Sequence, residues 1–109
     1  LFSEATVQKQ PELVEATWRV MIATPAQTVA GAQRGMAARP DVTSMLGVIN
    51  VPALVLCGEH DAISPPDEMR SIAEAIPRAQ YVEIAGAGHM APLEDPVAVN
   101  QAIRKFLET

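Results

Sequence analysis

A run of five apolar residues at positions 53–57, Ala-Leu-Val-Leu-Cys, constrains the fold of this chain more than any other feature. Because no polar residue alternates with the apolar ones, the run predicts a strand covered on both faces, as strands of parallel sheets are. Residues 65–76 follow with apolar side chains at helical spacing, and residues 80–84 then alternate as a second strand does. A helix between two strands predicts that the strands run parallel, with a right-handed crossover.

The rest of the sequence predicts helices. Thr24-Pro25-Ala26-Gln27 has the sequence of a capping box, and residues 41–49 predict one or two helical turns. Three longer helices are predicted, over residues 11–23, residues 24–38 and residues 95–107. The fold class is therefore α/β, with a helical segment over residues 1–40 and a β-α-β-α unit over residues 41–109.

Charge, hydropathy and cysteine content indicate which kinds of binding partner and which cellular location to expect. The chain has 109 residues, a net charge of −5 and no run of basic residues, so we expect no nucleic-acid partner. No apolar run has the length that a bilayer crossing needs, so we expect no membrane partner. Cys57 is the one cysteine, so no disulfide can form within the chain, and we expect a reducing, cytoplasmic location.

Two chemically informative side chains follow the two strands. Asp61 lies in the loop after residues 53–57, and His89 lies in the glycine-containing loop after residues 80–84. Because the carboxyl ends of parallel neighbours meet at one edge of a sheet, we expect these side chains to approach each other. A carboxylate bound to one ring nitrogen fixes the imidazole tautomer, and it stabilises the imidazolium that forms when the other nitrogen takes a proton from a nucleophile.

Neighbouring polar residues have simpler interpretations. His60 lies beside Asp61, but no third ligand stands at a useful spacing, so we expect no metal site. We expect Glu59 to be solvated, and Cys57 to pack as a small apolar residue rather than act as a nucleophile. Glu94 has two interpretations, a partner of the histidine loop or an ordinary first-turn acid, and we favour the second.

Two segments carry a resemblance to a known family. Residues 51–65, Val-Pro-Ala-Leu-Val-Leu-Cys-Gly-Glu-His-Asp-Ala-Ile-Ser-Pro, resemble the acid-bearing strand and loop of α/β-hydrolase-fold enzymes. Residues 84–96, Ile-Ala-Gly-Ala-Gly-His-Met-Ala-Pro-Leu-Glu-Asp-Pro, resemble the histidine segment of that family. The likeness is greatest to the esterase, lactonase and cofactor-free haloperoxidase-like branch, where a helical cap segment often precedes an Arg-Pro-Asp like residues 39–41. The resemblance covers about residues 24–109.

The resemblance implies a catalytic triad with Asp61 as its acid and His89 as its base, and it implies no cofactor and no metal. The departure from the family is large, because neither its Gly-x-Ser-x-Gly nucleophile motif nor its oxyanion loop occurs among the 109 residues. We therefore expect this chain to be a piece of a longer protein, made of the last part of the cap and the last two strands. We also expect the piece to be inactive alone.

The implied substrate is a small carboxylic ester or lactone, hydrolysed through a serine acyl-enzyme. Three alternatives stay open: an aspartate nucleophile would give a dehalogenase, the cap could select an amide or a C–C bond, and the protein could be a non-catalytic binding protein of hydrolase fold. In the cap segment, Trp18, Met21 and Met36 could line a substrate pocket, although packing in a core or cap is the commoner use of such residues.

The edge of strand 53–57 also indicates whether copies of this chain associate with one another. In the family's fold it would have a second neighbour, and without one it leaves unpaired N–H and C=O groups on an apolar strand. A two-stranded sheet is only marginally stable by itself. We therefore expect a homo-oligomer, most simply a two-fold dimer. The chief alternative is that residues 11–38 fold back over the sheet and cover this edge.

Overall fold

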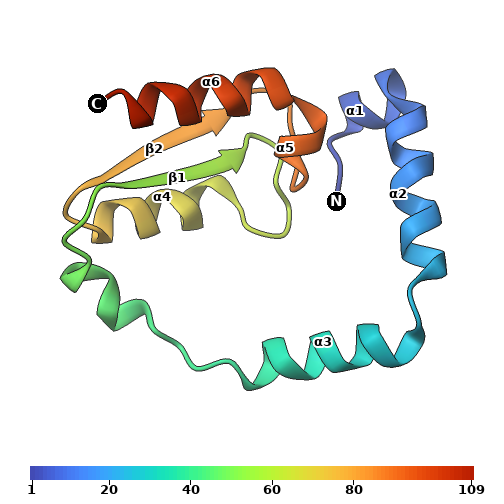
Figure 1. Cartoon of the computed structure of the whole chain (residues 1–109), viewed down its shortest axis with the longest axis horizontal. Helices are drawn as coiled ribbons and strands as arrows, with labels where there is room; N and C mark the ends of the chain where they lie inside the picture. Colours follow the sequence, from blue (N-terminus) through green and yellow to red (C-terminus); the bar gives the residue numbers. More distant parts are fainter.

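The computed structural model describes residues 1–109. In chain order, the elements are α1 (Glu4–Lys9), α2 (Pro11–Ala23), α3 (Ala26–Ala38), the 3₁₀ helix η1 (Thr43–Val48), β1 (Ala53–Gly58), α4 (Pro66–Ala75), β2 (Ala79–Ile84), α5 (Ala91–Glu94) and α6 (Pro96–Leu107). Figure 1 shows α4 and α6 on opposite sides of the two strands, whereas α2 and α3 extend away from the sheet. The chain thus has a layered part and an extended helical part.

The two strands form the sheet that positions the site. β1 and β2 run parallel, with Ala53 opposite Ala79 and Gly58 opposite Ile84, so the predicted pairing is confirmed. Helix α4 provides the crossover between them. Because the register is unbroken, both strands end at the same level, and the loops that follow them leave the same edge of the sheet.

One part of the core lies between the sheet and α6. One buried cluster is made of Ile84, Ala87, Ala91 and Val99, which come from β2, the loop after it, α5 and α6. Leu56 and Val82, which face each other across the two strands, pack against this cluster. Burial of a side chain as large as Ile84 contributes roughly 1.5–3 kcal/mol. Because Ala87 belongs to the loop after β2, the core itself holds that loop in place.

On the opposite face of the sheet, beside α4, Val55, Cys57, Ala73 and Ile76 are buried, and polar groups make further contacts. The Tyr81 hydroxyl donates to Glu83 Oε2 at 2.8 Å, and Arg70 Nη2 of α4 donates to the same oxygen at 3.2 Å. The Arg70 guanidinium also lies 5.2 Å from the centre of the Tyr81 ring, which is a cation–π distance. Burial and the hydrogen bond to Glu83 raise the pKa of Tyr81 to about 12. The contacts of Arg70 join α4 to β2 at the surface.

Some local predictions differ from the structure. The capping box expected at Thr24 does not form, because the Thr24 hydroxyl donates to the Val20 carbonyl at 2.8 Å. Pro25 is instead the N-cap residue of α3 and makes no side-chain hydrogen bond. Helices α1 and α5 were not predicted, since six and four residues are too few to show a helical period.

Helices α2 and α3 contribute no buried residue. Trp18, Met21 and Met36 are each more than half exposed, so within this chain they do not pack in a core. Figure 1 places both helices away from the sheet, so residues 11–38 do not fold back over it.

The sheet has only two strands, which leaves the far edge of β1 without a partner strand. Dimerisation through this edge stays a prediction. None of the helices combines the length and the apolar character needed to cross a bilayer.

Gly58 offers a direct test of how tightly the two loops approach each other. A Cβ at this position would lie 2.6 Å from the Ala87 carbonyl oxygen and would also collide with the Gly88 carbonyl. Because these obstacles are backbone atoms, we expect Gly58→Ala to lower the free energy of unfolding by about 1–3 kcal/mol in urea titrations. Gly31→Ala is the matched control, since nothing lies within 4 Å of its Cβ, and it should raise stability by about 0.5–1 kcal/mol. Equal stability of Gly58→Ala and the parent chain would contradict the close approach.

Candidate functional site

The loops after β1 and β2 are joined to each other by backbone hydrogen bonds. The Glu59 amide donates to the Ile84 carbonyl at 3.0 Å, and the His60 amide donates to the Ala87 carbonyl at 2.8 Å. Gly86 turns the second loop with φ of 69°, a left-handed conformation that glycine adopts without strain. The ladder of the sheet therefore continues into the loops, and they act as one rigid edge.

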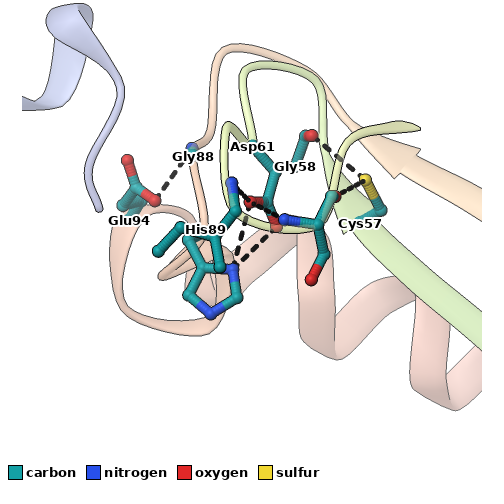
Figure 2. Close-up of polar contacts among 8 residues, drawn as sticks. Cys57, Gly58, Asp61, Gly88, His89 and Glu94 are labelled. Atoms are coloured by element: carbon teal, nitrogen blue, oxygen red, sulfur yellow. Dashed lines mark hydrogen bonds and ion pairs between the residues drawn. The ribbon is translucent and has the colours of Figure 1, made fainter. Parts of the chain in front are cut away.

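This edge brings Asp61 and His89 together. His89 Nδ1 lies 2.9 Å from Asp61 Oδ2 and 3.1 Å from Asp61 Oδ1 (Figure 2). Asp61 is only 8% exposed, whereas the His89 side chain is 35% exposed. The contact predicted between these two side chains is present, with the acid on the inner side and the imidazole toward the surface.

The Asp61 carboxylate is held by its own loop. Asp61 Oδ1 accepts hydrogen bonds from the amides of Ile63 and Ser64, each at 2.9 Å. Burial by itself would raise the pKa of Asp61, but the amides of Ser64 and Ile63 and the imidazole of His89 together hold the pKa below its usual value. The carboxylate is therefore ionised and fixed in orientation at neutral pH.

An ionised carboxylate only accepts hydrogen bonds, so the geometry assigns the shared proton to His89 Nδ1. In the uncharged ring, Nε2 then carries a lone pair, and this nitrogen makes no hydrogen bond within the chain. A hollow of about 220 Å³ adjoins Asp61 and His89 and is walled by Leu56, Met69 and Val99 among other residues. The site thus presents a proton acceptor beside a largely apolar space.

Glu94 has a role that we did not favour from the sequence. Its side chain is buried, and its Oε2 accepts from the Gly88 amide at 2.8 Å (Figure 2) while its Oε1 accepts from the Ser3 amide at 2.8 Å. Glu94 does lie in the first turn of α5, but it is not an ordinary first-turn acid, because the alternative interpretation, a partner of the histidine loop, is confirmed. No sequence pattern revealed the contact with Ser3, because the two residues are 91 positions apart.

The remaining candidates lie at the margin of the site. Glu59 is partly exposed, as expected of a solvated acid, but its Oε2 also accepts from the Gly86 amide at 2.7 Å. His60 is exposed, and no three potential metal ligands gather anywhere in the chain. Cys57 is 4% exposed, as predicted for a packed residue, and burial raises the pKa of its thiol. A raised pKa disfavours the thiolate, the form that acts as a nucleophile.

The charge on Asp61 should be visible in the pH dependence of stability. Because the folded-state pKa lies below the ordinary value of 3.8, the ionised carboxylate stabilises the fold above that value, and the contribution is lost as pH falls through the folded-state pKa. Asp61→Asn keeps an oxygen for the loop amides but removes the charge. We expect it to lower the free energy of unfolding by about 1–3 kcal/mol at neutral pH and to flatten the acidic limb of the profile.

Asp67→Asn is the control for this experiment, because Asp67 is exposed in the first turn of α4. We expect it to change stability by less than about 1 kcal/mol, the usual size of an interaction with a helix dipole. Denaturant titrations at several pH values give both profiles. An acidic limb of equal slope in Asp61→Asn and the parent chain would contradict the role assigned to the charge.

Comparison with known proteins shows the family to which the chain belongs. A family model described as the alpha/beta hydrolase fold matches residues 1–96. The structure of a thermophilic esterase from Thermogutta terrifontis is 45% identical with a TM-score of 0.95, over 99% of this chain and 40% of that chain. The enol-lactonase from Burkholderia xenovorans LB400 is 29% identical with a TM-score of 0.89, over 99% of this chain and 41% of that chain.

A relative known from its sequence matches the chain over a similar share of its length. The 3-oxoadipate enol-lactonase 1 of Acinetobacter baylyi is 28% identical over 108 residues, which are 99% of this chain and 40% of that protein. The chain therefore spans about 40% of the length of these relatives. The resemblance predicted from the acid and histidine segments is confirmed. Since the family model matches most of its residues, the chain belongs to the α/β-hydrolase fold family.

Proposed function

We propose that this chain supplies the acid and the base of a serine hydrolase that cleaves a carboxylic ester or a lactone. The observation that carries the proposal is the bond between His89 Nδ1 and Asp61 at 2.9 Å, which leaves Nε2 without a hydrogen-bond partner in the chain. The esterase and enol-lactonase relatives support this substrate class.

In the proposed reaction, His89 Nε2 takes the proton of a serine hydroxyl while the serine oxygen attacks the carbonyl carbon of the ester. The imidazolium then gives this proton to the departing alcohol oxygen, which leaves an acyl-enzyme. Water repeats the sequence on the acyl-enzyme and releases the acid. Asp61 keeps the ring in the productive tautomer and stabilises the imidazolium, because its charge lies against Nδ1–H in a buried position.

A lactone differs from an open ester only in the fate of the leaving group. The alcohol released from a lactone stays covalently attached to the acyl chain, so the same proton transfers open a ring instead of expelling an alcohol.

We place the serine and the oxyanion donors outside these 109 residues. Ser3, Ser44, Ser64 and Ser71 are the serines of the chain, and none stands in a Gly-x-Ser-x-Gly sequence. We therefore expect the 109-residue chain to have no ester-hydrolase activity by itself.

Turnover by the full-length protein tests the proposal. We expect His89→Ala and Asp61→Asn each to lower kcat/KM for a chromogenic acyl ester by about 10³-fold or more, because each removes a member of the proton-transfer pair. His60→Ala is the matched control, since His60 is an exposed neighbour of Asp61, and it should keep near-normal turnover. Circular dichroism checks that all three variants fold. Normal turnover by folded His89→Ala would refute the assignment.

A further inference from the structure

Glu94 is a buried carboxylate that the proposed proton transfers do not use. It is 6% exposed and has no cation as a partner; two backbone amides satisfy it instead. One oxygen accepts from Gly88, which directly precedes His89, and the other accepts from Ser3, each at 2.8 Å. A carboxylate shared in this way joins two backbone segments that are far apart in the sequence.

The same residue also holds the far end of α1. The Gln10 side chain donates from Nε2 to the Glu94 carbonyl oxygen at 2.9 Å. Ser3 is the N-cap residue of α1 and Gln10 is its C-cap residue. The side chain of Glu94 therefore holds the start of α1, and its backbone holds the end, so α1 is docked as a unit beside the histidine loop.

Two more observations connect this docking to His89 itself. The His89 amide donates to the Leu1 carbonyl at 2.8 Å, so the segment that enters α1 is bonded directly to the histidine backbone. A Cβ at Gly88 would lie 2.6 Å from the Ser3 nitrogen and 2.8 Å from the Phe2 carbonyl carbon. The two backbones are therefore in close contact, and the position of residues 1–3 limits where residues 88 and 89 can lie.

We infer that Glu94 is a positioning residue for His89. By tying α1 to the amide of Gly88, it fixes the backbone from which the imidazole reaches Asp61, and it thereby sets the Nδ1–Asp61 hydrogen bond. The description of His89 as a base rests on the proposed function, but the geometric link between Glu94 and the ring does not. Loss of the tie should let the ring move relative to the Asp61 carboxylate, which its own loop holds still.

The test uses Glu94→Gln in the 109-residue chain. Glutamine keeps the shape of glutamate, but only one of its two terminal atoms accepts a hydrogen bond, so its NH₂ group must oppose either Gly88 N–H or Ser3 N–H. We expect hydrogen exchange at these amides to accelerate at least about tenfold. We also expect the His89 Nδ1–H proton to exchange severalfold faster and the ¹⁵N shifts of the ring to change.

Ring nitrogen spectra can be assigned because the chain has only two histidines, and His60→Gln removes the second signal. Glu59→Gln is the matched control: Glu59 also accepts from an amide of the histidine loop, Gly86, but it makes one such bond and is partly exposed. A glutamine there can keep its acceptor on Gly86. We expect the His89 ring signals and Nδ1–H exchange to stay as in the parent chain.

The inference is overturned if Glu94→Gln speeds exchange at Gly88 and Ser3 while the His89 ring signals and Nδ1–H exchange stay unchanged. If Glu94→Gln fails to fold, Glu94→Asp decides, because its carboxylate keeps the charge but is one methylene shorter and cannot reach both the Gly88 and the Ser3 amides. Faster Nδ1–H exchange in Glu94→Asp supports the inference, and an unchanged ring contradicts it. These measurements involve no substrate, so failure of the proposed function, seen as normal turnover by His89→Ala, is a separate result.

Discussion

The parallel pairing of β1 with β2 is the constraint on which the rest of the structure depends. Parallel strands need a crossover, which α4 provides, and they present their carboxyl ends at one edge. Gly58 and Ile84 are register partners at that edge, so the two loops begin side by side. An antiparallel pair would send the same loops to opposite ends, and the contact between Asp61 and His89 could not form.

Carboxylates that accept hydrogen bonds from backbone amides hold the loops at this edge of the sheet in place. Several loop amides have no backbone carbonyl as a partner and need other acceptors. Asp61 accepts from its own loop, Glu59 bridges from the first loop to the second, and Glu94 bridges from the second loop to the N-terminal segment. Each bond joins an acidic side chain to an uncharged amide, so none requires a buried cation. The result is a chain of contacts from β1 through the histidine loop to α1.

The sequence was sufficient to predict the β-α-β unit and the approach of Asp61 to His89. Both follow from local patterns, an apolar run, a helical period and an alternating run, combined with the geometry of a parallel crossover. It was not sufficient for Glu94 or α1. The carboxylate of Glu94 meets Ser3 across 91 positions, and no periodicity records such a contact. The capping box at Thr24 was wrong because the hydroxyl finds a nearer acceptor in the preceding helix, the Val20 carbonyl.

We propose that the Asp61–His89 pair activates a serine that lies outside residues 1–109. A fluorophosphonate tests this most directly in the full-length protein, because attack by a serine oxygen on phosphorus expels fluoride and leaves a stable Ser–O–P bond, while the base takes the serine proton. Mass spectrometry of the digested protein then locates the adduct. We expect one labelled serine outside these residues and, in His89→Ala, labelling about 10²-fold slower or more. An adduct on Cys57 or on a serine of this chain, or equal labelling rates with and without His89, would contradict it.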